Sequence, residues 1–347
     1  MSATNSASCA VTTVDPCDDP AWERLSRGPR GSLFTAPPWL RAVRDTYARP
    51  LQARITDRGG LAYCELDDVM GARIVSIPYC DFADPIVDDA ATWHSLVDPL
   101  ITPGRPFRMR TLHDQVATTD PRFSLLGEDF WHGVELQVDL DEKWAALGST
   151  ARRNVRKARN AGVTVRFDDT SAGVDTFFDL HLATRRAKHG MIAQPRQFFH
   201  EIHRHFVVDD AVSIAVAELD GHPIAAIFLL EWNGRAYYKF NASDPAALEA
   251  RPNDLVMWEC IEHAAGRGND VLDLGLSDAD QDGLVRYKRK WASLEGHVRT
   301  LVAGPAKTPE ATALGPVLGG ITSLLTDPDV PAHVAEAAGD LLYPFFA

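Results

Sequence analysis

The sequence lacks several patterns that assign a chain to a class of enzyme. No C-x-x-C pair occurs among Cys9, Cys17, Cys64, Cys80 and Cys260, and their number is odd, so neither a zinc site nor a disulfide framework is predicted. There is no G-x-S-x-G elbow and no P-loop, which leaves serine hydrolase and nucleotide triphosphatase activities without support. We therefore predict no metal and no cofactor, and the cysteine usage favours a reducing cytoplasm.

Positive charge and long apolar runs are also scarce. The chain has 35 Lys and Arg against 48 Asp and Glu, a net charge of -13, which argues against wrapping DNA or lying flat on an anionic membrane. A local polyanion site remains compatible with this balance. The N-terminus lacks a basic region followed by an apolar stretch, so no secretory signal is predicted. The apolar run 311–325 is too short and too interrupted to span a membrane, and peripheral membrane contact stays the minority alternative.

The chain is long enough for about two domains, and its pattern of elements predicts an α+β architecture in each half. Asp220-Gly221 and Asn233-Gly234 lie between apolar runs and predict two tight hairpins. We predict units at 1–145 and 146–304, followed by a helical appendage at 305–347. The predicted helices are two within 21–47, then 91–100, 149–161, 174–189, 195–206 and 253–265. The predicted strands are 51–55, 61–66, 72–77, 107–112, 133–140, 163–167, 212–219, 223–232, 235–241 and 271–274.

The segment 272–296 stands out, because a short strand leads through a polar loop into the cluster Tyr287-Lys288-Arg289-Lys290-Trp291. Two interpretations stay open for this cluster. Either it carries chemistry, or Tyr287 and Trp291 are core residues at i and i+4 and Lys288 is solvated.

The segments 77–86 (IPYCDFADPI), 149–165, 218–230, 236–243 and 273–291 together resemble the FemAB-like family of GNAT-type acyltransferases. That family includes peptidoglycan bridge-forming aminoacyltransferases and relatives in natural-product pathways. The resemblance covers roughly residues 30–300. It implies two tandem GNAT-like domains with mixed, largely antiparallel sheets, a cleft between them, and acyl transfer to an amine. In the best-known members the donor is aminoacyl-tRNA. Leu276 and Ser293 stand where the family usually has Arg and Gly, which leaves the substrate open.

The resemblance also implies roles for individual residues. Lys288 matches the lysine of the family's aromatic-Lys-x-x-Trp pattern and is expected to face the acyl carbonyl or the donor's terminal adenosine, with Tyr287 beside it. Asp81 is expected to orient the acceptor amine, with Tyr79 shaping the pocket; an Asx-turn at Asp81 is the equal alternative. Tyr238 and Trp291 complete the predicted substrate-binding set.

A dense basic run, 152–159, predicts contact with phosphate through Arg152 and Arg156, either on a tRNA acceptor stem or on a nucleotide-linked acceptor. The alternative is a solvated helix. A coenzyme A-binding loop would need glycines between the strand ending near 241 and the helix beginning near 253, and the sequence there is ASDPAALEARPND. Its carboxylates would repel phosphate, and only Arg251 is suited to contact it.

These observations favour an aminoacyltransferase that forms an amide with an amine of a cell-wall precursor or a small secondary metabolite. Two alternatives stay open: an acyl-CoA N-acyltransferase, and a non-catalytic binding module in envelope or polysaccharide assembly. The histidines of FFHEIHRHF lack zincin spacing and predict an amphipathic helix.

Overall fold

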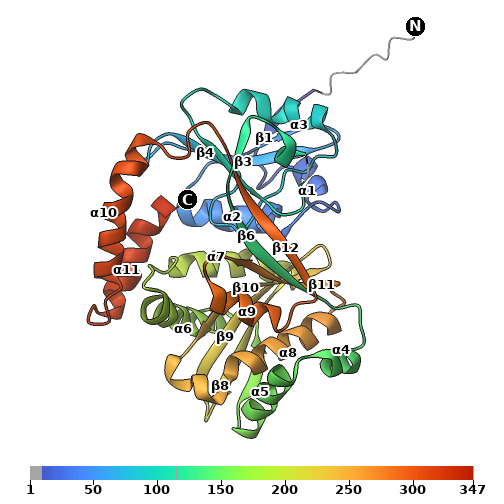
Figure 1. Cartoon of the computed structure of the whole chain (residues 1–347), viewed down its shortest axis with the longest axis vertical. Coiled ribbons are helices and arrows are strands. Elements are labelled where there is room, and N and C mark those ends of the chain that lie inside the picture. Colours follow the sequence, from blue (N-terminus) through green and yellow to red (C-terminus); the bar gives the residue numbers. More distant parts are fainter. Residues whose placement is uncertain (1–9, 115, 347) are drawn as a thin grey trace.

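In the computed structural model, which describes residues 10–114 and 116–346, the chain forms two lobes joined by one sheet (Figure 1). The elements of the first lobe are β1 (Thr12–Val14), α1 (Pro20–Ser26), α2 (Pro37–Tyr47), β2 (Leu51–Ile55), β3 (Gly60–Leu66), β4 (Arg73–Val75), α3 (Ala90–Val97), β5 (Phe107–Thr111) and β6 (Phe123–Glu135). The second lobe contains α4 (Leu140–Ala146), α5 (Ser149–Asn160), β7 (Thr164–Asp168), α6 (Ser171–His189), α7 (Arg196–Phe206), β8 (Val212–Leu219), β9 (His222–Trp232), β10 (Arg235–Ser243), α8 (Pro252–Gly266), β11 (Val271–Ser277) and α9 (Asp282–Arg289). The chain then continues through β12 (Leu294–Ala303), α10 (Pro309–Leu325), α11 (Ala332–Leu342) and the 3₁₀ turn η6 (Tyr343–Phe346).

The described strands form a single 12-stranded sheet in the order β1-β2-β3-β4-β5-β12-β6-β11-β10-β9-β8-β7. Within it, β4–β5 and β10–β11 pair in parallel, and the other neighbours pair antiparallel. β6 and β12 run between the lobes (Figure 1), and β12 returns from the second predicted unit to pair with β5 and β6 of the first. The predicted α+β class, with a mixed and largely antiparallel sheet, is confirmed.

The largest apolar core crosses from one lobe to the other. Trp39 of α2 packs edge-on against Phe198 of α7, with ring centroids 5.6 Å apart. The Tyr237 hydroxyl on β10 accepts a hydrogen bond from the backbone N–H of Leu33 in the first lobe. Smaller cores lie between α5, α8 and the sheet, and between α3 and the first-lobe strands. The lobes are therefore held together by buried apolar surface and not only by the chain connections.

Most predicted elements are confirmed, including the hairpins. Asp220, Gly221, Asn233 and Gly234 all have positive φ, as a two-residue type I′ turn requires. The strand predicted over 133–140 is wrong in its bounds: β6 begins at Phe123 and ends at Glu135. Asp139 instead caps α4, accepting hydrogen bonds from the backbone N–H groups of residues 141 and 142.

The helical appendage predicted from 305 onward is confirmed as α10 and α11, which lie along one side of both lobes (Figure 1). Within the described chain, no helix combines the length and the apolar character needed to cross a membrane. Cys17, Cys64, Cys80 and Cys260 are free and buried, and Cys9 lies outside the described residues.

Candidate active site

The site begins where two parallel strands separate. β10 and β11 pair only from Arg235 to Tyr237 and from Val271 to Asp273, and both strands continue beyond this point without pairing to each other. β11 instead stays paired with β6, with a register irregularity between Asp273 and Leu276. Beyond Tyr237 and Asp273 the facing edges of the two strands are therefore no longer bonded to each other.

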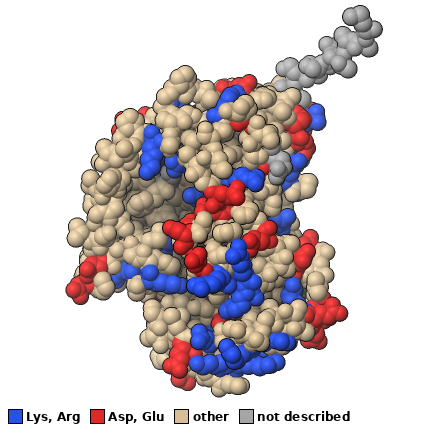
Figure 2. All heavy atoms as spheres, viewed as in Figure 1, with Lys and Arg blue, Asp and Glu red and all other residues tan. Residues whose placement is uncertain are grey.

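A cavity of about 510 Å³ opens at this point, where the lobes meet the C-terminal helices. Figure 2 shows this face hollowed beside the C-terminal helices. Among its lining residues are Tyr79, Cys80, Asp81, Arg108, Arg110, Arg185, Lys239, Phe240, Leu276, Tyr343 and Phe346. The cavity thus draws on the first lobe, the second lobe and the C-terminal turn.

Asp81 and Lys239 form an ion pair in the cavity wall. Lys239 Nζ donates to Asp81 Oδ1 at 2.6 Å, and the two side chains are 7% and 22% exposed, respectively. Burial alone would raise the pKa of Asp81, but the Lys239 ammonium holds it below its usual value. Asp81 is therefore a carboxylate at neutral pH, suited to accept hydrogen bonds from an ammonium and poorly suited to act as a general base.

A β-bulge explains why Lys239 faces the cavity. The register of β10 against β9 shifts between Tyr238 and Phe240, so that Lys239 is the extra residue. As a result Lys239 and Phe240 both line the cavity, and the ammonium lies 4.9 Å from the centroid of the Phe240 ring. Lys239 was not among the predicted site residues; a lysine between the aromatic residues Tyr238 and Phe240 was the available signal.

Lys288 of α9 lies just behind the cavity wall. The residue is 4% exposed, and Nζ donates to the backbone carbonyls of Gly275 at 3.1 Å and Leu276 at 2.5 Å. Burial lowers its pKa to about 8, against the opposing carboxylates of Asp81 and Asp273. The alternative that Lys288 is solvated is therefore wrong. Its ammonium is buried beside Leu276, which lines the cavity.

Gly275 sits between the two charged groups. Its φ is +71°, and a Cβ at this position would lie 2.8 Å from Asp81 Oδ2. Asp273 Oδ1 accepts a hydrogen bond from its backbone N–H at 2.7 Å, and burial raises the pKa of Asp273 to about 6. The strand bend therefore brings Asp81, Asp273 and Lys288 together only because residue 275 has no side chain.

The structure does not bring Tyr238, Tyr287 or Trp291 to the cavity. All three pack with the core beneath α8, on the other side of the sheet. The Tyr287 hydroxyl donates to the carbonyl of Asn253 at 2.9 Å, and Trp291 is 3% exposed. The contacts of these aromatic residues are those of core residues. Alternation along the strand points Tyr238 away from Lys239, and the helical turn of α9 points Tyr287 away from Lys288.

Tyr79 does line the cavity, in contact with the C-terminal turn. It has φ +61°, and its hydroxyl donates to the carbonyl of Pro344 at 2.9 Å. Its ring lies 4.0 Å from that of Tyr47 and 5.8 Å from that of Tyr343, centroid to centroid. Tyr79 was predicted to shape the acceptor pocket, but no local pattern predicted the C-terminal turn that contacts it.

Three guanidinium groups in the cavity bond to backbone carbonyls and to no carboxylate among the described residues. Arg108 donates to Ala306, Arg110 to Cys80 and Arg185 to Ile192, at 2.9, 3.4 and 3.1 Å. On a chain of net charge -13, these groups make the cavity a local concentration of positive charge. These arginines were not among the predicted site residues, because they come from separate elements.

The basic helix α5 lies at the lower edge of the molecule, where Figure 2 shows Lys and Arg gathered. Arg152 donates to the carbonyl of Ala145 at 3.1 Å, and the Arg156 guanidinium lies 5.8 Å from the Trp144 ring centroid. Neither residue lines the cavity. Contact with phosphate at Arg152 and Arg156 stays a prediction for a surface separate from the cavity.

The N-terminus of α8, where a coenzyme A-binding loop would lie, is occupied by protein groups. Asp254 in the first turn accepts a hydrogen bond from Asn154 at 3.0 Å and forms an ion pair with Lys290. Arg251, at the residue before α8, is exposed with φ +62°. The Asp254 carboxylate opposes anion binding at this helix end. The exposed Arg251 side chain is still able to contact a phosphate group from the solvent side.

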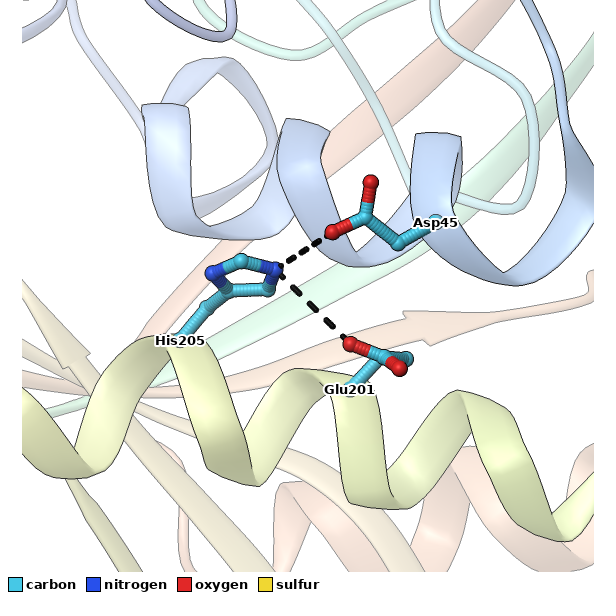
Figure 3. Close-up of side chains that lie close together, drawn as sticks. All are labelled: Asp45, Glu201 and His205. Carbon is cyan, nitrogen blue, oxygen red and sulfur yellow. Dashed lines mark hydrogen bonds and ion pairs between the residues drawn. The ribbon is translucent and has the colours of Figure 1, made fainter.

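A second polar cluster lies on the α2–α7 interface, away from the cavity. His205 points toward Asp45 of α2 and toward Glu201 one turn earlier on α7 (Figure 3), at 3.0 and 3.8 Å. Arg204 also contacts both carboxylates. Arg44 also pairs with Asp45, so guanidinium groups already pair with both carboxylates, and we interpret the cluster as an ion-pair network between the lobes. The predicted amphipathic helix for FFHEIHRHF is confirmed as α7.

Comparison with known proteins identifies the second lobe. Residues 148–289, about two fifths of the chain, match the family model described as the acetyltransferase (GNAT) domain. The segment is a GNAT-type acyltransferase domain. The site described above falls within this domain and its contacts, because the match includes β10, β11 and Lys288. No curated protein sequence is significantly similar to the chain.

Solved structures extend the likeness to most of the chain. FemX matches with a TM-score of 0.67 at 14% identity, over 84% of this chain and 96% of FemX. The C-terminal domain (DUF2156) of a putative lysylphosphatidylglycerol synthetase from Agrobacterium fabrum matches with a TM-score of 0.55 at 16% identity, over 81% and 91%. A tandem GNAT protein from the clavulanic acid biosynthesis pathway matches with a TM-score of 0.51 at 11% identity, over 86% and 99%.

At these identities the structural likeness establishes the fold. The predicted class, tandem GNAT-like units with a helical C-terminal tail, is confirmed, and so is the prediction of an acyltransferase. The predicted boundaries at 145/146 and 304/305 stay predictions.

Proposed function

We propose that the protein is an aminoacyltransferase that moves an amino acid from aminoacyl-tRNA to an amine and so forms an amide. The observation that carries the proposal is the cavity at the β10–β11 separation, with the Asp81–Lys239 pair in its wall and Lys288 behind it. The similarity to FemX, a structure whose likeness extends over most of both chains, supports this choice of acyl transfer.

The reaction requires attack of a neutral amine nitrogen on the ester carbonyl carbon of the donor. A C–N bond forms, the bond between the carbonyl carbon and the ribose oxygen breaks, and the ribose oxygen leaves with the proton that the attacking nitrogen loses as it becomes an amide. Asp81 would accept hydrogen bonds from the incoming ammonium and hold the nitrogen in line for attack. The amine proton passes to solvent before attack, because the lowered pKa of Asp81 makes it a weak base.

The oxyanion needs a donor that is already in place. An ammonium has three N–H groups, and Lys288 uses two of them on the carbonyls of Gly275 and Leu276. We assign the third to the developing oxyanion at the wall lined by Leu276. A buried cation acts there in a medium of low dielectric, where its effect on the transition state is large.

The proposed donor is aminoacyl-tRNA, because α8 begins with Asp254 already bonded and without the glycines that cradle a pyrophosphate. Arg152, Arg156 and Arg251 are the proposed contacts for the tRNA backbone, outside the cavity. This assignment implies a cytoplasmic location, where charged tRNA is found.

The proposed acceptor is an amine of a cell-wall precursor or of a small secondary metabolite. A cavity of about 510 Å³ accommodates a small molecule or the end of a larger one. Arg108, Arg110 and Arg185 would neutralise anionic groups of such an acceptor.

The proposal is tested by incubating the purified protein with single charged tRNAs or with acyl-CoA esters, each with a panel of amines. Mass spectrometry then identifies any amide. We expect amide only with a charged tRNA. If amide forms only from acyl-CoA, the donor is acyl-CoA and not aminoacyl-tRNA. If neither donor gives an amide, the result favours a non-catalytic binding module.

A further inference from the structure

The C-terminal segment connects the two lobes across the cavity. On the second lobe, Arg186 donates to the carbonyl of Asp327, and Arg196 forms an ion pair with Glu336 at 2.8 Å. On the first lobe, Arg49 donates to the carbonyl of Pro344 at 2.7 Å, and so does the Tyr79 hydroxyl at 2.9 Å. The end of the described chain is therefore fixed at both sides of the cavity.

The fit of α11 against the second lobe is close. A Cβ at Gly339 would lie 2.6 Å from the carbonyl oxygen of Ala193, whose neighbours Ile192 and Gln194 line the cavity. The absence of a side chain at residue 339 allows the helix to approach this loop. The position of η6 is thus set by backbone contact as well as by ion pairs.

Two side chains of η6 enter the cavity lining, Tyr343 and Phe346. The Tyr343 ring lies 6.2 Å from that of Tyr47 and 5.8 Å from that of Tyr79, so it closes an aromatic stack. No hydrogen-bond partner of the Tyr343 hydroxyl occurs among the described residues. Asp81 and Arg185 are the charged groups that act on it electrostatically. Tyr343 is half-buried, so its hydroxyl is available to a ligand in the cavity.

We propose that η6 is one wall of the substrate cavity and that Tyr343 limits which amines reach Asp81. This inference rests on the proposed function and names a specificity-determining residue for it. With Tyr343 in place the cavity is bounded on the side of the C-terminal helices. Without its ring, the space between Tyr79 and Arg185 opens, and bulkier amines fit.

The wall is tested without any substrate by alkylation of Cys80, which lines the same cavity and is 8% exposed. Burial raises the pKa of Cys80 to about 12, so iodoacetamide reacts with it slowly unless water enters the cavity. We expect Tyr343→Ala to label Cys80 several-fold faster than the wild type, read by peptide mass spectrometry. Tyr343→Phe keeps the ring and should label at the wild-type rate.

Two controls separate opening of the wall from unfolding. Cys260 lies on the buried face of α8 and is fully buried, so its labelling reports loss of the fold. Leu341→Ala changes an exposed residue of α11 that does not line the cavity, and it should leave Cys80 protected. If Tyr343→Ala labels Cys260 as well, Phe346→Ala decides, because Phe346 is 45% exposed and its loss should open the wall without unfolding the chain.

The activity arm compares glycinamide with tryptophanamide as acceptors, with a charged tRNA as donor. For Tyr343→Ala the ratio of kcat/KM for the bulky amine to that for the small amine should rise about tenfold, the size of a typical pocket effect. Labelling of Cys80 at the wild-type rate in both Tyr343→Ala and Phe346→Ala would overturn the proposal. An unchanged kcat/KM ratio between the two amines would also overturn it. If the wild type transfers to neither amine, the proposed function fails while the labelling still decides on the wall.

Discussion

Lys239 Nζ of β10 lies 2.6 Å from Asp81 Oδ1 of the first lobe, so an ion pair joins the lobes inside the cavity. Lys239→Met should leave the Asp81 carboxylate buried without its cation and lower the free energy of unfolding by on the order of 3 kcal/mol. The double variant Asp81→Asn/Lys239→Met should recover most of this loss. Urea unfolding of the four proteins measures the coupling, and additive single effects would contradict it.

Gly275 is a second position where the backbone conformation and a close contact exclude a side chain. Gly275→Ala places a Cβ 2.8 Å from Asp81 Oδ2 at φ +71°, so we expect a loss of stability of about 1–3 kcal/mol together with loss of transfer. Gly283→Ala is the matched control, because it lies in α9 with open space around it. It should be neutral or stabilise by about 0.5–1 kcal/mol in thermal unfolding. Equal behaviour of the two variants would refute the close approach.

The lowered pKa of Lys288 predicts a pH dependence of stability. Between about pH 8 and 10.5 the unfolded chain keeps the Lys288 proton and the folded chain releases it. The unfolded state therefore binds more protons than the folded state. Raising the pH over this range increases the free energy of unfolding by up to about 1.4 kcal/mol per pH unit. Relative to Lys288→Met, the wild type should gain stability over this range. Parallel curves for the two proteins in urea unfolding would show that Lys288 is not perturbed.

Coenzyme A should not stabilise the protein. The first turn of α8 carries Asp254, held by Asn154 and Lys290, so a pyrophosphate would meet a carboxylate instead of free N–H groups. Millimolar coenzyme A should leave the Tm unchanged in a thermal shift measurement. A rise in Tm that grows with coenzyme A concentration would restore the acyl-CoA alternative.

Local signals in the sequence were enough for the framework of the fold. Asp220-Gly221 and Asn233-Gly234 fix hairpin turns, and apolar spacing identifies the helices that pack on the sheet. The strand β12, Leu294–Ala303, was missed although Leu294, Gly296 and Val298 alternate with polar residues. Its partners β5 and β6 lie far back in the chain, and pairing of that kind leaves no local signal.

The candidate site was predictable only in part. Asp81, Tyr79 and Lys288 were selected from the family resemblance; Asp81 and Tyr79 line the cavity, and Lys288 lies behind its wall at Leu276. Predicting Lys239 as a site residue required knowledge of the β-bulge, because simple strand alternation does not place Lys239 and Phe240 on the same side of the sheet. Tyr343 enters the cavity through contacts with residues about 260 or more positions earlier, which no local pattern reports.

The proposed function depends on amide formation from aminoacyl-tRNA at the cavity in front of Lys288. The most direct measurement is transfer of a radiolabelled amino acid from charged tRNA to an amine, with and without prior ribonuclease treatment, in the wild type and Lys288→Ala. We predict labelled amide that disappears after ribonuclease and falls about 100-fold or more in the variant, as for loss of an oxyanion donor. Transfer that survives ribonuclease, or that is unchanged in Lys288→Ala, would contradict the account.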